Sequence, residues 1–192
     1  MAQIGTYHLA DNPQLYQPQF AFNFEFVVTD IDDIIRAGAI GNEANAKFAN
    51  AQEVLRCSVV SCDVPHFSQD EIEIQRGNNK VYFAGKPSFK EGTLVVNDFI
   101  GADTKSVLMA WQALSYNVGT EKIGSLDVTN YKKDAYLIEY TPDFRKVRQW
   151  VLHGCWVKGI SEDNYNYEDN GSKKITATIR YDRAEIDTSE LV

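Results

Sequence analysis

The chain has 192 residues, of which 44% are hydrophobic and 24% charged, so it is large enough for one globular domain with its own core. Its formal net charge of −8 argues against a protein that grips nucleic acid, because such a protein needs lysine and arginine to displace the counterions of phosphates. The charge is compatible with a surface along which nucleic acid passes without adhering.

Residues 1–19 are expected to form an irregular N-terminal arm, because Pro13 and Pro18 interrupt any regular element there. The first residues lack a basic segment followed by an apolar run, so we expect no signal peptide. No apolar run reaches the ~20 residues that a transmembrane helix needs, so we expect no membrane insertion. The three cysteines show no C-x-x-C spacing, which favours free thiols in a reducing compartment.

A half-buried strand is predicted over residues 20–28, where apolar side chains occupy every second position. Residues 31–50 are expected to form a loop with one short helix, which Asp30 or Asp32 would cap. The segment EVLRCSVVSCDV, residues 53–64, is predicted to be a long strand that ends at the following proline, because proline cannot donate to a ladder.

A β-hairpin is predicted next. Segments 71–75 and 80–85 alternate like strands, and they flank Arg-Gly-Asn-Asn, a turn whose residues tolerate positive φ. In the first segment the side chains of Glu71, Glu73 and Gln75 share the face opposite to two isoleucines.

A helix is predicted from Thr104 to Tyr116, with its N-cap at Asp103 or Thr104. Its apolar stripe consists of Val107, Leu108, Trp111 and Leu114. Further strands are predicted over residues 92–99, 135–140, 146–160 and 173–182. The whole pattern indicates a mainly β protein, an antiparallel β-sandwich or partial barrel with one flanking α-helix. We expect one domain, residues 1–192, that ends in a C-terminal tail, residues 183–192.

The sequence predicts no catalytic site, no cofactor and no metal site. His8, His66 and His153 are isolated, and no hydrolase or metalloprotease motif occurs. A Gly-Lys pair in the returning strand of the hairpin does not complete a phosphate-binding loop, because proline follows it and the context is strand-turn-strand. The acidic segment 161–174 places Ala177 where a calcium loop needs glutamate, so we expect a turn between two strands.

Several segments, taken in order, resemble the tail tube proteins of contractile-tailed bacteriophages. They are VPHF, RGNNKVYFAG, FKEGTLVVNDF, a helix with a tryptophan, YKKDAYLIEY, LHGCWVKGI and ITATIRYD. The resemblance runs from about Val54 to Asp182, roughly two thirds of the chain.

This resemblance implies a structural virion protein that is not an enzyme. Six copies would form a ring in which strands of each subunit join an inner β-barrel, and stacked rings would form the hollow tail tube that conducts DNA from capsid to host cell. Such closure removes exposed strand edges. The implied partners are further copies of the chain, a tape-measure protein, and sheath and baseplate or terminator proteins. DNA would cross the lumen without specific binding. The implied location is the virion tail, after assembly in the cytoplasm of the host bacterium.

Two groups of hairpin residues are candidate sites in such a tube. The candidate lumen-facing residues are Glu71, Glu73 and Gln75. Carboxylates there would repel the phosphates of passing DNA, although an ordinary solvated strand face has the same pattern. The candidate inter-subunit or inter-ring residues are Arg76, Gly77, Asn78, Asn79 and Lys80.

Two alternatives stay open. One is the tube subunit of a phage-derived contractile injection system or type VI secretion system, which would share the fold and export protein. The other is a β-sandwich carbohydrate-binding module, which the ten Tyr and three Trp support because sugars stack on aromatic faces.

Overall fold

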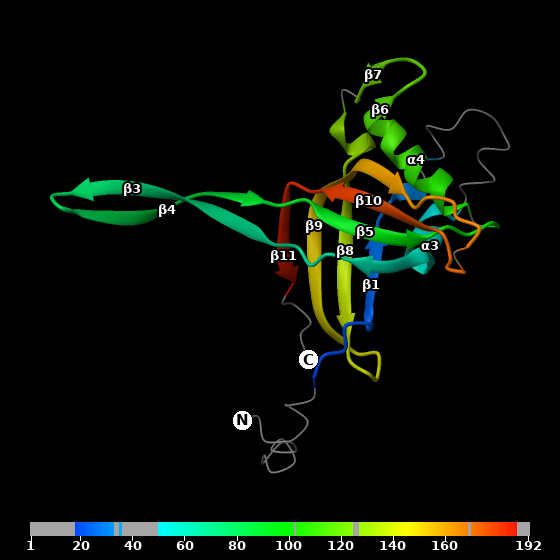
Figure 1. The fold of residues 1–192 in the computed structure, drawn as a ribbon, viewed down its shortest axis with the longest axis horizontal. Coiled ribbons are helices and arrows are strands. Elements are labelled where there is room, and N and C mark those ends of the chain that lie inside the picture. The colour runs from blue at the N-terminus through cyan, green and yellow to red at the C-terminus, as the bar shows by residue number, and fades with distance from the viewer. Residues whose placement is uncertain are drawn as a thin grey trace, which may run out of the picture.

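The computed structural model describes residues 18–32, 35, 50–101, 103–124, 127–168 and 170–187. This part of the chain is mainly antiparallel β-structure, as predicted, and it contains helix α4 (Thr104–Ser115) where a helix was predicted and helix α3 (Ala51–Ser58) where a strand was predicted (Figure 1). Neither helix of the described part is long and apolar enough to cross a membrane.

Seven strands form the main sheet, in the order β1-β8-β9-β10-β5-β2, with β11 paired to β9 off this path. Their bounds are β1 Phe24–Val28, β2 Val59–Cys62, β5 Gly92–Asn97, β8 Lys133–Tyr140, β9 Lys146–Glu162, β10 Lys174–Arg180 and β11 Arg183–Asp187. All these pairings are antiparallel. Four predicted strands are therefore confirmed, as β5, β8, β9 and β10.

The long strand β9 belongs to both halves of this sheet. Its residues up to Cys155 pair with β8 and β11, and its residues from Trp156 onward pair with β10. Gly154, next to this change of partners, has a φ of +66°. A positive φ strains residues with a Cβ, so the backbone conformation favours glycine here.

One contiguous core joins the two halves of the sheet and both helices. On β10, Ile175, Ala177 and Ile179 are buried, as the predicted alternation requires. Helix α4 (Thr104–Ser115) packs against β9 and buries the predicted stripe around Trp111. The Trp111 indole Nε1 donates a hydrogen bond to the Tyr131 carbonyl oxygen at 3.0 Å.

The strand predicted over residues 53–64 is wrong in its first half, because Ala51–Ser58 forms helix α3 and β2 begins only at Val59. The buried residues of α3 are Ala51, Leu55 and Ser58, whose spacing is helical. The helix starts where the Asp32 carboxylate accepts a hydrogen bond from the Gln52 amide at 2.7 Å. This capping group comes from 20 residues upstream, so the residue that caps the helix could not be recognised from the sequence next to it.

The first predicted strand and the predicted C-terminal tail also differ from the structure. The strand predicted from residue 20 begins at Phe24, because a turn precedes it in which Phe20 and Phe22 stack with ring centroids 5.2 Å apart. The C-terminal tail predicted from Arg183 is wrong for the first five residues, which form β11. They pair with a side of β9 that β8 leaves open.

Some predictions fall on residues outside the described part. Most of the N-terminal arm and of the loop over 31–50 belong to this group, as does the end of the C-terminal tail. Within the predicted short helix, Ile31, Asp32 and Ile35 have helical conformation, and both isoleucines are buried.

Candidate assembly interface

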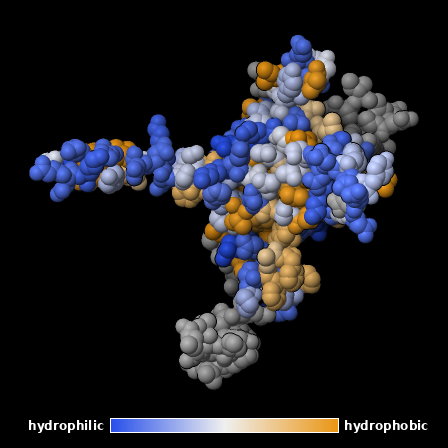
Figure 2. All heavy atoms as spheres, in the orientation of Figure 1, coloured by the Kyte–Doolittle hydropathy of each residue, from blue (hydrophilic) through white to orange (hydrophobic). Residues whose placement is uncertain are grey.

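A two-stranded hairpin extends from the body along the long axis of the molecule (Figure 1). It consists of β3 (Phe67–Arg76) and β4 (Asn79–Phe89), joined by a turn at Gly77 and Asn78. The predicted hairpin is therefore confirmed, but its strands are longer than expected. Nearly all its residues are exposed, and its strands contact mainly each other. Figure 2 shows it as a separate arm with hydrophilic and apolar side chains.

The turn has the conformation that its residues predicted. Gly77 has a φ of +59°, a region that residues with a Cβ adopt at a cost. The Gln75 side-chain amide donates a hydrogen bond to the Gly77 carbonyl at 3.2 Å, and Arg76 pairs with Asn79 across the turn. The tip is thus a tight hydrogen-bonded turn that connects β3 and β4.

Directly opposed residues of an antiparallel pair share a face, so the register gives the hairpin two distinct faces. The apolar hairpin face consists of Ile72, Ile74, Val81 and Phe83. The polar hairpin face consists of Glu71, Glu73, Gln75, Lys80, Tyr82 and Ala84. Ile72 and Phe83 are 52% and 47% exposed, although burying such a side chain fully is worth about 1.5–3 kcal/mol. The apolar hairpin face therefore lacks a partner within the described chain.

The structure brings the candidate lumen residues Glu71, Glu73 and Gln75 together on the polar hairpin face, as predicted from alternation. Lys80 on the same face forms an ion pair with Glu73 at 2.7 Å. The five candidate inter-subunit residues lie together at the tip. Which surface each group faces in an assembly stays a prediction.

The glycine of the Gly-Lys pair has a role that the sequence patterns do not reveal. The register shifts between Gln69 and Glu71, which marks a β-bulge in β3. Gly85 lies beside this bulge, and a Cβ there would stand 2.6 Å from the Asp70 carbonyl oxygen. Only glycine allows this close approach of two backbones, so the pair belongs to the hairpin and not to a ligand loop.

The base of the hairpin is anchored by aromatic rings. Phe67 and Phe89 have ring centroids 5.6 Å apart, and Phe89 meets Tyr181 at 6.2 Å. Phe89 and Tyr181 also belong to the core cluster or pack against it. The arm is therefore attached to the body through its base, while its distal part is free of the body.

Two adjoining loops form the opposite end of the long axis (Figure 1). We call them the loop end, defined as residues 98–101, which follow β5, and residues 163–168, which follow β9. The Asp98 amide donates a hydrogen bond to the Lys173 carbonyl at 3.1 Å, which holds the two loops together. The predicted acidic turn between two strands is thus confirmed, because it connects β9 to β10.

Lys173 fixes the conformation of the longer loop. Its ammonium group contacts the Glu162 carboxylate at 2.7 Å and the Tyr165 hydroxyl at 2.6 Å. Lys105 from α4 pairs with the same carboxylate at 2.6 Å. Hydrogen bonds from Lys105 and Lys173 hold the pKa of Glu162 below its ordinary value. Lys173 therefore ties Tyr165 to the end of β9, while the other side chains of residues 163–168 face solvent.

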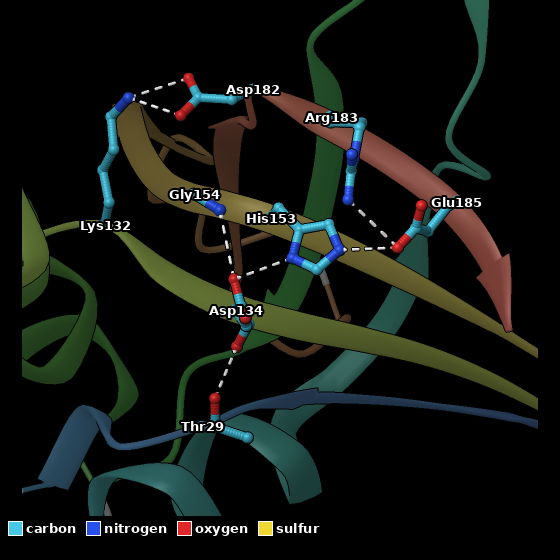
Figure 3. A network of polar contacts seen from close by, with 8 residues as sticks. All are labelled: Thr29, Lys132, Asp134, His153, Gly154, Asp182, Arg183 and Glu185. Atoms are coloured by element: carbon cyan, nitrogen blue, oxygen red, sulfur yellow. Dashed lines mark hydrogen bonds and ion pairs between the residues drawn. The ribbon is translucent and has the colours of Figure 1, made fainter.

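His153 lies in a polar network that attaches β11 to the sheet (Figure 3). Its Nδ1 is 3.4 Å from the Asp134 carboxylate on β8, and its Nε2 is 3.1 Å from Glu185 on β11. Both ring nitrogens thus have carboxylate neighbours, one on each of the strands beside β9. His66 contacts the Val64 carbonyl at 3.4 Å, and His8 lies outside the described residues.

A cavity of about 710 Å³ lies beside α4 and the short hairpin of β6 (Tyr116–Asn117) and β7 (Lys122–Ile123). Its apolar lining includes Met109, and Tyr131 and Trp156 meet there edge to face at 88°. Lys158 is the charged side chain that lines it. No cluster of three or more potential metal ligands occurs among the described residues.

The comparisons with known proteins agree with this architecture. No known family model matches the chain. The tail tube proteins gp19 of Enterobacteria phages T4 and T6 are each 22% identical to it over 148 residues, which is 73% of this chain and 89% of the relative.

Two solved structures share the fold. A chain of the PVC sheath–tube complex in the extended state, from an extracellular contractile injection system, has a TM-score of 0.64 at 14% identity, over 93% of this chain and 98% of that one. The tube-terminating cap of the anti-feeding prophage has a TM-score of 0.62 at 15% identity, over 98% of this chain and 100% of that one.

Proposed function

We propose that this chain, a relative of phage tail tube proteins with the fold of contractile injection-system components, is a structural subunit of the hollow tail tube of a virion. The observation that carries the proposal is the projecting hairpin. It presents an apolar face that its own body does not cover, and a second subunit is the simplest cover for it.

Six copies form a ring in this proposal, and rings stack into a tube. Strands of each subunit join an inner β-barrel around the ring. Support comes from β3 and β4, which pair only with each other within the described chain, so the outer edge of each strand has no partner strand there. Unpaired edges invite aggregation unless another strand or subunit covers them, and closure around a ring covers them.

The partners follow from this role. The chain contacts further copies of itself, and sheath, baseplate or terminator proteins at the outside and ends of the tube. A tape-measure protein occupies the lumen until DNA replaces it. The chain acts as one tail tube domain, has no enzymatic step and needs no cofactor. It is assembled in the cytoplasm of the host bacterium and ends up in the virion tail.

In this proposal the polar hairpin face lines the lumen. Glu71 and Glu73 then present carboxylates to the passing DNA, although Lys80 partly neutralises Glu73. Like charges repel, so the DNA slides without adhering. The net charge of −8 means that the subunit as a whole also repels the phosphates of DNA.

Electron microscopy of the purified protein tests the proposal. Negative stain over a range of concentrations is expected to show rings or tubes with a central hole. Compact monomers at the highest concentration would contradict it, since a tube subunit must self-associate.

A second candidate is the tube of a contractile injection device that exports protein. The TM-score of 0.64 with the injection-system chain favours it. Neighbouring genes discriminate between the two functions, because portal and terminase genes accompany a phage tail and toxin genes accompany an injection device. A carbohydrate-binding module has less support, because Tyr131 and Trp156 stand at 88° and do not offer one flat surface to a sugar.

A further inference from the structure

Two exposed apolar surfaces lie at opposite ends of the long axis of the molecule (Figure 1). One is the apolar hairpin face. The other is the loop end, where Tyr167, Ile100 and Tyr165 are 109%, 105% and 87% exposed. These three are the most exposed large apolar side chains of the described part of the chain. Such a gathering on two adjoining loops marks an interaction surface.

Side-chain contacts tie the base of the loop end to the body. The Ser172 hydroxyl contacts the Asn97 side chain at 3.2 Å, and Lys173 holds Tyr165 with its ammonium group 4.2 Å from the ring centroid. A surface that is fixed in advance loses little conformational freedom on binding, which favours affinity.

The two ends carry complementary charge. Asp163 and Glu168 on the loop end have no ion pair among the described residues, and their side chains face solvent. Arg76 at the hairpin tip likewise has no ion pair there, whereas its neighbour Lys80 is paired with Glu73. A guanidinium group is well suited to bind a carboxylate through two hydrogen bonds.

We propose that the hairpin tip of one subunit docks onto the loop end of a second copy. Arg76 meets Glu168 or Asp163, the turn beyond it at Asn78 lies against Tyr167, and the apolar hairpin face covers Ile100. The contact joins two different surfaces, so repeating it gives a ring if the rotation closes and a continuous stack if it does not. This inference rests on the proposed tube function and names the surface that receives the hairpin.

The cavity beside α4 is the competing receptor for the hairpin. It is apolar, and its lining offers no carboxylate to Arg76, because its charged residue is Lys158, which is already paired with Glu91 at 2.5 Å. The loop end offers Asp163 and Glu168. Charge complementarity therefore favours the loop end, and the cavity becomes the alternative outcome of the test.

Disulfide cross-linking in assembled protein tests the inference. In a Cys57→Ser background, Asn78→Cys places a thiol at the tip and Tyr167→Cys one on the loop end. Mild oxidation of the double variant is expected to give a ladder of covalent multimers on a non-reducing gel, because a disulfide requires Cα atoms within about 7 Å. Val118→Cys, on the exposed turn beside the cavity, replaces Tyr167→Cys in the matched control. Each single variant is expected to give no ladder.

Charge exchange provides the second measurement. Arg76→Glu and Glu168→Arg are each expected to raise the concentration needed for assembly about tenfold. In the double variant, which exchanges the two charges, this concentration is expected to return close to that of the unmodified protein. Circular dichroism of each variant checks that the subunit is folded.

The outcomes separate the two proposals. If the unmodified protein forms tubes but Asn78 cross-links only to position 118, or to neither position, the receptor assignment is overturned and the tube function stands. Unaltered assembly of the Arg76→Glu variant overturns it as well. If the unmodified protein forms neither rings nor tubes, the tube function fails, and the docking contact fails with it.

Discussion

Gly85 shows how one residue can control a surface far from it. It borders the bulge at the base of the hairpin, where backbone atoms of β3 occupy the space that a side chain would need. The bulge fixes the direction in which the arm leaves the body, because the extra residue bends and twists its strand. Gly154 likewise supplies a conformation that favours glycine, a positive φ, where β9 changes its partner strands.

Gly85→Ala is expected to abolish assembly while the thermal midpoint of the subunit changes by only a few degrees. The added methyl group pushes against the Asp70 carbonyl, so the bulge shifts and the hairpin points elsewhere. Scanning calorimetry and negative-stain microscopy measure the two effects. Gly159→Ala is the matched control, since a Cβ at that strand position meets no atom within 4 Å. Tubes of normal yield from Gly85→Ala would refute this role.

The three cysteines are expected to differ sharply in reactivity. Burial raises the pKa of Cys62 to about 12, with a smaller contribution from Asp63, and burial raises the pKa of Cys155 well above its ordinary value. Thiolate is the reactive form, so neither should react at pH 8, whereas Cys57 is exposed. Titration with a thiol reagent is expected to modify one cysteine in the native protein and three in denaturant. Rapid modification of two or more native thiols would contradict the packing around β2 and β9.

At the scale of elements, sequence patterns succeed where the determining signals are local. Helix α4 has its apolar stripe and its cap within one segment, and the Asp103 carboxylate accepts a hydrogen bond from the Ser106 amide at 3.1 Å as predicted. The hairpin turn is equally local, because its glycine supplies the positive φ. Helix α3 was missed because Asp32, which caps it, is distant in the sequence.

In the candidate interface, too, the features with a local sequence signal were predicted and those without one were not. Alternation correctly placed Glu71 and Glu73 on one face of the hairpin, since register follows from a tight turn. The loop end could not be found from sequence, because Ile100 and Tyr167 are 67 residues apart in the chain and only the fold brings their two loops together. The bulge at Gly85 also leaves no local signal beyond an isolated glycine.

The polar hairpin face yields a prediction for assembled particles. The double substitution Glu71→Lys/Glu73→Lys is expected to slow or stall DNA ejection, because lysines in the lumen would attract phosphates and hold the DNA. Ejection kinetics measured by dye release from triggered virions report the effect. Glu53→Lys/Asp143→Lys changes the net charge equally on the body surface and is expected to eject normally. Equal ejection by both variants and the unmodified virion would remove the polar hairpin face from the lumen.

At the scale of the whole molecule, the body and the arm have separate roles. The core joins both half-sheets and both helices, whereas the distal hairpin adds almost no contact with it. Folding of the body therefore does not depend on the distal hairpin, which leaves the hairpin available for the proposed contact with a second copy.

Replacing residues 71–84 by a two-glycine turn is expected to leave a folded monomer. The unfolding transition of the body should keep its midpoint within a few degrees, because the removed residues pack mainly on one another. Sedimentation velocity is expected to show a single small species at concentrations at which the full chain assembles. Loss of cooperative unfolding in the shortened chain would mean that the arm helps to hold the core together.

The continuity of β9 has a mechanical consequence. Its residues serve both half-sheets without an intervening loop, so a force applied to one half passes to the other through covalent backbone bonds. No loop lies between the halves to act as a hinge, and the ladders on both sides of the junction hold β9 to its neighbours. Each subunit should therefore behave under load as one stiff block, and a tube built from such blocks would transmit thrust along its axis with little deformation within the subunits.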